Sequence, residues 1–591
     1  MENIKHIFNN KWFTVSALII FCTIAISIRF SKLQEPFGYI DDSVISMLIQ
    51  DSQNINTQGN PGIQRAQDRL EKYFNSETAS NLVKYAIDIY PYFAVPLSGL
   101  TYAPLQYTIY PLFINNKLSY EEVKYRSRLP SVIFSLLSIL LFLFISSKIK
   151  GVYGSLQVRI LYLSLICFSL EQYIYSRWAL PYSAGVFCST LLSWMLLFMK
   201  FDRTNLILFG LILSFLCCLQ YQIIFFLPGL TACLLFHCHN TKDKFFSIMT
   251  KLLFAPTITI CILYIIFLRS MQTPGINYSA GQSLEYIFNP EKNISLVSMK
   301  YCINFFYENI PLAFATLFTP ITLDKKSAWQ LGGLFFIAWA LGTYKMIFCS
   351  GNRRLMCYGI FSISIFLTIV GMVGLKIIAL GPTRHLIIYL PIFSIPVTFY
   401  ISSLKFDYIP IVGRIVRMLP ALIALCLGGA FFWNLPARDI EMIDVFDEIK
   451  IFNLLGEYQP DMIITSCALP VVLMPSVTKK YPLIYDCGAQ NIRWRNQIDF
   501  NKKYKKIIFF SSMHELNEID FMRISRLTEK KAGRKVLNEY LGCWHINPIR
   551  IQKGQYLAEV LNLTSYSAGR NSIYVYELLL KRNCSFGVIV P

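Results

Sequence analysis

The chain has 591 residues, of which 54% are hydrophobic, 15% aromatic and only 15% charged. A soluble protein carries about 25% charged residues, so the composition excludes an ordinary soluble fold. The formal net charge of +20 does not indicate nucleic-acid binding, because much of it lies in short loops between apolar segments and in a basic C-terminal region. The expected partners of this charge are membrane lipids, as anionic headgroups or phosphorylated lipid substrates.

Apolar segments that could cross a bilayer fill most of the first 435 residues. A helix needs about 20 apolar residues to span the hydrocarbon core. The first segment, 13–28, is not followed by a small-residue cleavage site, so we predict a retained anchor instead of a signal peptide. The predicted fold class is an α-helical polytopic membrane protein with about eleven transmembrane helices. They begin near Phe13, Leu129, Leu156, Ala184, Asn205, Gln222, Leu252, Gln330, Met356, Leu386 and Leu419.

Lysine and arginine residues alternate in density between successive short loops. If the N-terminus is cytoplasmic, the loops on that side are rich in Lys and Arg, whereas the short outside loops hold only Arg177, Lys376 and Arg384. This pattern follows the positive-inside rule. We therefore predict a protein of the plasma membrane, which in a bacterium is the inner membrane, with a cytoplasmic N-terminus. An odd number of spans places the C-terminus outside, in the periplasm.

Two segments are too long to be simple connections, and both are predicted to lie outside. The first, about 30–126, includes a polar helical stretch over 63–85 and an apolar piece over 92–100 that is typical of an interfacial helix. The second is the C-terminal tail, about 436–591. A third, shorter outside segment runs over about 270–326. The predicted domains are a transmembrane domain over 1–435, which includes the large first loop, and a soluble domain over 436–591.

The tail has the sequence pattern of a soluble domain. Short apolar runs at 462–465, 483–485, 507–510 and 572–576 alternate with helical patterns such as 441–455. This alternation predicts an extracytoplasmic α/β or α+β domain. About 155 residues are enough for a core of its own.

Two adjacent carboxylates, Asp41 and Asp42, lie about a dozen residues after the first span. Carboxylates close to a bilayer are costly unless they are paired, hydrated or used. One could act as a general base toward an acceptor hydroxyl or amine, and one could hold a metal ion. Alternatively, the pair caps the N-terminus of a helix that begins near Ser43. Capping is the simpler interpretation of the pair alone.

Five short segments occur in an order and topology that resembles a known family. They are Tyr-Ile-Asp-Asp at 39–42, Ala-Pro-Leu-Gln-Tyr at 103–107, Arg-Ser-Arg-Leu-Pro-Ser at 126–131, Tyr-Ser-Arg-Trp-Ala-Leu-Pro-Tyr at 175–182 and Gly-Pro-Thr-Arg-His at 381–385. Together they resemble the GT-C glycosyltransferases, and most closely the branch of protein O-mannosyltransferases and aminoarabinose transferases. The resemblance covers roughly residues 10–430. The tail after 436 matches no family that we can name.

The resemblance implies transfer of a sugar from a polyprenyl-phosphate carrier at the outer face, with inversion at the anomeric carbon. The acceptor would be an envelope glycolipid, a polysaccharide or a protein. Asp41 is then the general base, and Asp42 is its partner or the ligand of a divalent cation such as Mg²⁺ or Mn²⁺. The family often has a second acidic residue where this chain has Tyr182, so that role is absent or belongs to Glu171.

The leaving phosphate needs cations at the membrane interface. The resemblance gives this role to Arg384, with His385 and Lys376 nearby, and with less support to Arg128 and Arg177. Without the resemblance, an arginine at a helix end that extends to lipid headgroups is an equally good interpretation of Arg384.

Two alternative functions remain open from the sequence. One is an oligosaccharide ligase or polymerase, which would use related chemistry. The other is a lipid or solute transporter, which typically has paired broken helices in two related halves. We find no such repeat in the sequence, and a transporter has little need of the long first loop and the tail.

Overall fold

The computed structural model forms two compact units, and much of each is described in detail. Unit 1 comprises Met1–Ser31, Asn54–Tyr110 and Leu129–Leu435, and unit 2 comprises Lys32–Gln53, Pro111–Arg128 and Pro436–Pro591. The described residues are 11–31, 33, 67, 70–71, 74–89, 104–114, 118–153, 156–200, 202–241, 245–266, 296–374, 380, 384–404, 410–441, 448–466, 471, 474–486, 492–495, 506–511, 544–552 and 573–580. Asp41, Asp42, Lys376 and the predicted interfacial helix over 92–100 lie outside these ranges.

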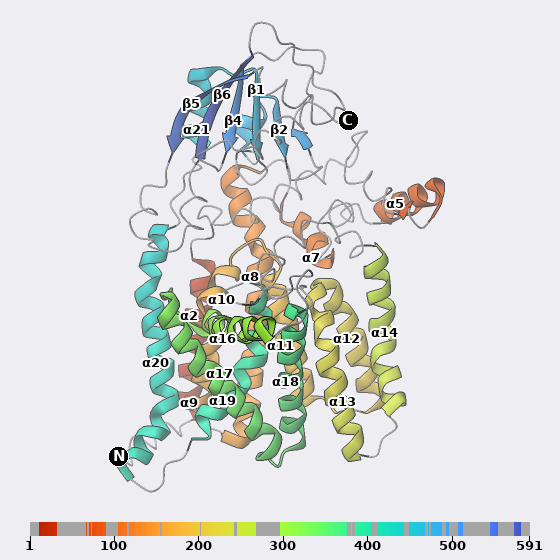
Figure 1. Ribbon diagram of the computed structural model, residues 1–591, viewed down its shortest axis with the longest axis vertical. Coiled ribbons are helices and arrows are strands. Elements are labelled where there is room, and N and C mark those ends of the chain that lie inside the picture. Colours follow the sequence, from red (N-terminus) through yellow and green to blue (C-terminus); the bar gives the residue numbers. More distant parts are fainter. Residues whose placement is uncertain are drawn as a thin grey trace. The chain divides into compact units, whose positions relative to one another are not determined.

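Unit 1 is a bundle of helices (Figure 1). In chain order, its elements are α2 (Lys11–Phe30), α5 (Ser76–Ile89), α7 (Pro104–Ile109), most of α8 (Tyr120–Tyr153), α9 (Leu156–Cys167), α10 (Leu170–Tyr175), α11 (Tyr182–Phe198), α12 (Arg203–Leu219), η3 (Tyr221–Phe226), α13 (Leu227–Thr241), α14 (Phe245–Ile266), α16 (Leu296–Phe318), α17 (Lys325–Phe348), α18 (Arg353–Gly374), η5 (Arg384–Tyr389), α19 (Leu390–Ser402) and most of α20 (Pro410–Glu441).

Apolar helices occur at all eleven positions predicted from the sequence. Within the described residues, six are long and apolar enough to cross a membrane: Tyr120–Ser146, Tyr221–His239, Phe245–Ile262, Lys325–Phe348, Arg353–Val373 and His385–Ser402. The other five, Val15–Phe30, Leu156–Cys167, Tyr182–Phe198, Arg203–Leu219 and Met418–Asn434, have 10–17 residues. The chain is therefore a multi-pass membrane protein, whereas the count of eleven spans and their orientation stay predictions.

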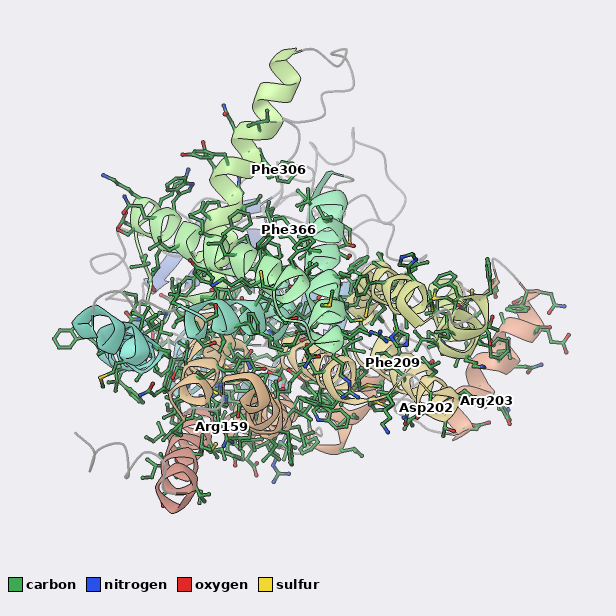
Figure 2. The ribbon with its side chains drawn as sticks, turned by 90° about the horizontal axis from the view of Figure 1, so that it is seen from below. Arg159, Asp202, Arg203, Phe209, Phe306 and Phe366 are labelled. Carbon is green, nitrogen blue, oxygen red and sulfur yellow. The ribbon has the colours of Figure 1, made fainter. Side chains whose placement is uncertain are left out.

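The segment predicted as a third outside loop contains a long helix, α16. Figures 1 and 2 show that α16 runs across the direction of the other long helices and extends away from the bundle, with Phe306 on it. Its outer half exposes Ile303 and Tyr307, while its other end, from Leu312 to Phe318, is buried. Leu170 of α10 donates its backbone N–H to the carbonyl of Thr319 at 3.0 Å, which fixes this inner end.

Basic side chains tie together helix ends that the sequence assigns to the cytoplasmic side. Arg354 donates to the carbonyl of Leu197 at 3.2 Å, at the end of α11. Lys345 donates to Ser403 Oγ at 2.9 Å and so joins the ends of α17 and α19. Arg159, labelled in Figure 2, donates to Ser146 Oγ at 3.3 Å. Cations at helix C-termini also interact favourably with the helix dipole.

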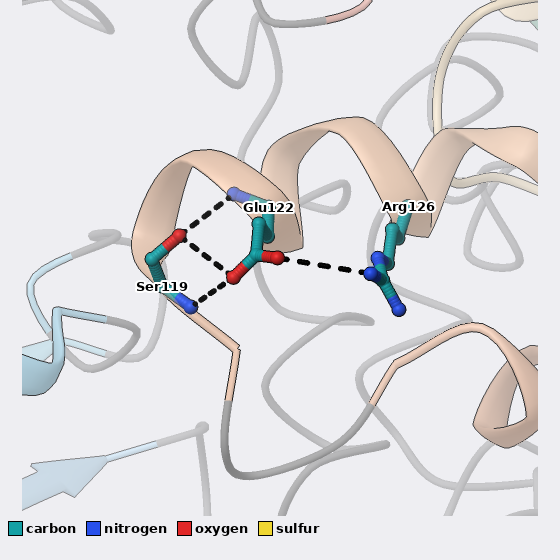
Figure 3. Close-up of polar contacts among 3 residues, drawn as sticks. All are labelled: Ser119, Glu122 and Arg126. Carbon is teal, nitrogen blue, oxygen red and sulfur yellow. Dashed lines mark hydrogen bonds and ion pairs between the residues drawn. The ribbon is translucent and has the colours of Figure 1, made fainter.

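In unit 2, the start of α8 is fixed by a capping box (Figure 3). Ser119 Oγ accepts from the backbone N–H of Glu122 at 3.3 Å, and the Glu122 carboxylate accepts from the backbone N–H of Ser119 at 2.9 Å. Two N–H groups that a helix start leaves unpaired are thereby satisfied. Glu122 also pairs with Arg126 at 3.7 Å, one turn further along α8.

Unit 2 also contains a six-stranded mixed sheet in the order β3-β2-β1-β4-β6-β5. β1 pairs in parallel with β2 and β4, while β3, β5 and β6 pair antiparallel to their neighbours. The elements are α21 (Glu448–Tyr458), β1 (Met462–Ser466), α22 (Pro475–Thr478), β2 (Leu483–Asp486), β3 (Ile492–Arg495), β4 (Lys506–Ser511), β5 (Trp544–Gln552) and β6 (Ile573–Leu580). Strands thus occur at the four predicted apolar runs, and both additional strands are edge strands.

Candidate functional site

The candidate site in unit 1 is built around α10, a helix of 6 residues between α9 and α11. Ser169 begins it as an N-cap, because its hydroxyl accepts from the backbone N–H of Gln172 at 3.4 Å. A tight turn over 176–181 then leads into α11. Ser183 Oγ donates to the carbonyl of Tyr175 at 2.8 Å, so the start of α11 is held against the end of α10.

Arg177 lies in this turn and is 6% exposed. Its Nη1 donates to the carbonyl of Ser31 at 3.2 Å, and its guanidinium carbon lies 4.0 Å from the centre of the Tyr173 ring. A cation over an aromatic face is stabilised by the ring quadrupole. Arg177 is therefore held inside unit 1 and does not extend to lipid headgroups. Its positive charge is fixed in place by its neighbours.

His385 lies beside the same turn. Its Nδ1 is 3.2 Å from the hydroxyl oxygen of Tyr182, the first residue of α11, and the two rings meet edge to face at 5.9 Å. Tyr182 in turn packs on the ring of Tyr175 at 5.0 Å. The backbone of Arg384 begins the 3-10 helix η5, and His385 follows it directly. We name Tyr173, Tyr175, Arg177, Tyr182 and His385 the α10–η5 cluster.

A chain of hydrogen bonds joins three of the segments that carry the family resemblance. Gln106 Nε2 donates to the hydroxyl of Tyr110 at 3.1 Å, and this hydroxyl is 3.2 Å from Ser131 Oγ. Ser131 Oγ also donates to the carbonyl of Leu180 at 3.1 Å. Gln106, Tyr110 and Ser131 are all buried. Segments 103–107, 126–131 and 175–182 are therefore linked by buried polar contacts, although the sequence separates them widely.

Arg29, at the end of α2, is a buried residue that sequence analysis did not single out. It is fully buried, and it donates to Ser135 Oγ at 2.7 Å, to the carbonyl of Ala25 at 2.8 Å and to the carbonyl of Cys167 at 3.4 Å. Its positive charge lies close enough to that of Arg177 for the two to repel each other. An arginine at a helix end is also compatible with a side chain that extends to lipid headgroups, so only its partners on α8 and α9 reveal its burial.

The other predicted site residues are more scattered. Arg128 belongs to unit 2, where it is 2% exposed and donates to the carbonyl of Leu33 at 2.8 Å. Glu171 lies in the first turn of α10 and is half-buried. The backbone of Arg384 is described, but its side chain is not. Asp41, Asp42 and Lys376 lie outside the described residues, so their roles stay predictions.

A metal ligand set was predicted only for Asp42. Among the residues that the structure describes, no group of three or more His, Cys, Asp or Glu side chains could hold a metal ion. Since Asp42 is not one of these residues, a Mg²⁺ or Mn²⁺ ion stays a prediction.

Comparison with known proteins gives a distant structural likeness. No protein-family model and no curated protein matches the chain. ArnT from Cupriavidus metallidurans in the apo state is similar over 84% of this chain and 93% of that chain, with 10% identity and a TM-score of 0.41. The same ArnT bound to undecaprenyl phosphate is similar over 95% of this chain and 98% of that chain, with 11% identity and a TM-score of 0.41. A TM-score of 0.41 does not establish a shared fold.

Proposed function

We propose that this chain is a GT-C type membrane glycosyltransferase that transfers a sugar from a polyprenyl-phosphate carrier to an acceptor at the outer face of the membrane. The observation that carries the proposal is the hydrogen-bonded chain from Gln106 through Tyr110 and Ser131 to the carbonyl of Leu180. It links three of the five segments that resemble the family. The bond between Tyr182 and His385 connects a fourth segment to them.

The α10–η5 cluster and the buried Arg29 support a role in binding a leaving phosphate. Arg177 and Arg29 bring two buried guanidinium groups into one part of unit 1. His385 adds an imidazole, and a role of Arg384 in the same site stays a prediction from the sequence. Cationic and N–H groups fixed in a water-poor site stabilise charge that develops on a leaving group, because no reorganisation is needed during the reaction.

The proposed reaction is a single displacement. The acceptor oxygen or nitrogen attacks the anomeric carbon while the bond from that carbon to the phosphate oxygen breaks. The phosphate keeps the bonding electron pair and stays in the membrane as polyprenyl phosphate. The Asp41 carboxylate takes the proton of the acceptor, and Asp42 orients it. One displacement inverts the anomeric configuration. The acceptor would be a glycolipid, a glycan or a protein of the cell envelope.

The decisive experiment replaces Asp41 by Asn. Asparagine has nearly the same shape and still caps a helix, so a capping role predicts little loss. It cannot accept a proton, so the proposed role predicts a fall in turnover of roughly 100-fold or more. Transfer from a synthetic polyprenyl-phosphate sugar by the purified chain is the measurement. Asp42→Asn is the matched control and should lose less.

The same assay separates transfer from transport. A transferase liberates polyprenyl phosphate in step with glycosylated acceptor, whereas a transporter leaves the lipid-linked sugar intact. Full activity of Asp41→Asn would remove Asp41 from the mechanism. Absence of polyprenyl phosphate release by the unmodified chain, with a range of acceptors, would contradict the proposed function itself.

A further inference from the structure

The hydrogen bond between Tyr182 and His385 has a chemical consequence beyond packing. Tyr182 is 6% exposed, and its hydroxyl oxygen lies 3.2 Å from His385 Nδ1. A neutral imidazole has one nitrogen that donates and one that accepts. The partner of one nitrogen therefore determines where the ring proton resides.

A tyrosine hydroxyl that donates to Nδ1 places the imidazole proton on Nε2. The Nε2–H group then points away from Tyr182, on the opposite side of the ring. The alternative tautomer carries its proton on Nδ1 and presents a lone pair at Nε2, which repels a phosphate oxygen. Protonated histidine also carries a proton on Nε2. Nε2 is thus a hydrogen-bond donor both in the neutral ring that accepts from Tyr182 and in the protonated ring, whose Nδ1–H would instead donate to the Tyr182 oxygen.

Both partners are held firmly enough to fix this arrangement. The Tyr182 ring packs on Tyr175, and the neighbouring Ser183 is bonded to the carbonyl of Tyr175. One turn further along α11, Gly185 approaches Ile388 of η5 so closely that an added Cβ would lie 2.5 Å from a methyl group of Ile388. The close approach of α11 and η5 keeps Tyr182 and His385 in register.

We propose that Tyr182 is a positioning residue, which holds His385 as the Nε2–H tautomer so that the imidazole donates to the phosphate of a polyprenyl-phosphate carrier. This inference rests on the proposed function, in which His385 binds that phosphate.

The experiment measures binding of a synthetic polyprenyl phosphate, without sugar, to the purified full-length chain in detergent. Tyr182→Phe removes the hydroxyl and keeps the ring. We expect binding to weaken about 2- to 10-fold, as for the loss of one hydrogen bond. In the transfer assay, KM for the carrier-linked sugar should rise and kcat should fall, because the same N–H group binds the carrier phosphate and stabilises the charge that it gains on leaving.

The matched control is Tyr389→Phe, which likewise removes the hydroxyl of a buried tyrosine, in this case one in η5. Tyr389 is 2% exposed and packs on Phe226, and it lies four residues from His385. This control should bind the carrier like the unmodified chain. Equal loss in both variants would show a general packing effect and overturn the proposed role of Tyr182.

A double-mutant cycle identifies whether Tyr182 acts through His385. In the His385→Ala background, Tyr182→Phe should cause no further loss of binding, because residues that act through one contact are not additive. His385→Gln places an amide N–H near the position of Nε2 and does not depend on a tautomer. In that background, Tyr182→Phe should change binding by less than about 2-fold. Additive losses would overturn the inference.

The outcomes separate this inference from the function on which it rests. Loss of carrier binding in His385→Ala with normal binding in Tyr182→Phe overturns only the positioning role. Normal carrier binding and normal transfer activity in His385→Ala would remove His385, and with it Tyr182, from the phosphate site and would leave the proposed function standing. An unmodified chain that binds no polyprenyl phosphate contradicts the proposed function as well.

Discussion

Two helices of similar apolar character have opposite environments in unit 1. In α19 with the preceding η5, 83% of the residues over His385–Ser402 are buried, whereas in α14 only 17% of those over Phe245–Ile262 are buried. Hydropathy therefore identifies both as membrane helices without distinguishing the interior one. Lipid tails are as apolar as leucine, so no hydrophobic force sorts helices into the interior.

What distinguishes α19 is its packing and not its residue types, because α14 also contains a proline, Pro256, and a threonine, Thr250, that is bonded to its own helix. Ser394 is buried and donates to the carbonyl of Leu390 at 2.6 Å, so its hydroxyl is satisfied within its own helix. The carbonyl of Pro396 lies against Gly342 of α17, where only a glycine leaves room. By contrast, α14 exposes large side chains such as Phe254 and Ile258. Close approach to a neighbouring helix thus marks the interior.

The largest effect should come from an aromatic side chain of the interior. Phe393 is 2% exposed, stacks on Phe314 with ring centres 5.4 Å apart, and meets Trp339 at the same distance. Phe393→Ala should lower the free energy of unfolding by about 3 kcal/mol, through lost packing and a cavity. Phe254→Ala in α14, where the ring is 66% exposed, should change it little. Unfolding in mixed micelles measures both, and equal losses would contradict the contrast between α19 and α14.

Glycine contacts of α17 should give the next largest effect. A Cβ at Gly332 would meet the carbonyl of Pro311 in α16, and one at Gly342 would meet that of Pro396 in α19. Gly342→Ala should therefore destabilise unit 1 by about 1–3 kcal/mol, because backbone atoms cannot move aside cheaply. Gly333→Ala is the matched control, since nothing lies within 4 Å of its added Cβ. If the two variants unfold alike, α17 does not pack as described.

A buried hydrogen bond between helices should contribute less. The Tyr358 hydroxyl of α18 is 3.0 Å from Ser193 Oγ of α11 and donates to the carbonyl of Ile392 at 3.4 Å. Such bonds in membrane proteins contribute about 0.6 kcal/mol on average, so Tyr358→Phe should lower the unfolding free energy by about this amount. Tyr344→Phe in α17, where the ring is 57% exposed, is the control. A loss well above 2 kcal/mol would indicate a wider network than this pair.

The smallest effect is expected at an exposed helix start. Asp324 is the N-cap of α17 and accepts from the backbone N–H groups of Lys326 and Ser327 at 3.0 and 3.1 Å. Bonds from Ser327 hold the pKa of this carboxyl below its usual range. A carboxyl whose pKa is lower in the folded state stabilises the fold at pH values above its unfolded-state pKa. This stabilisation is lost as the pH falls through the folded-state pKa. Asp324→Ala should therefore lower Tm slightly at neutral pH, and the difference should shrink in acid. A pH-independent difference would assign the effect to the loss of the side chain alone.

The strands of unit 2 show how much of that fold is predictable from the sequence. The runs at 462–465, 483–485, 507–510 and 572–576 are apolar and coincide with β1, β2, β4 and β6. The missed strands, β3 and β5, are the two edges of the sheet. β5 contains Pro548 beside a register irregularity, and a proline cannot donate to the ladder. Neither edge strand has a continuous apolar run, because its apolar residues are separated by polar ones such as Arg493 and His545.

The candidate site was predictable only in part. The sequence singled out His385, Arg128 and Arg177, but it predicted neither the burial of the two arginines nor the bond from His385 to Tyr182. It missed Arg29, because an arginine at a helix end is equally compatible with a side chain that extends to headgroups. The roles of Asp41, Asp42 and Lys376 stay predictions.

The sequence by itself determined where the apolar helices lie and that the chain is a multi-pass membrane protein, because hydropathy is a property of each segment alone. Only the tertiary structure decided that α19 is interior while α14 faces outward. It also joined Gln106, Ser131 and Leu180 through Tyr110, and brought Tyr182 to His385 across 203 positions of sequence. Such contacts depend on how helices pack, and packing is decided by pairs of surfaces that no single segment encodes.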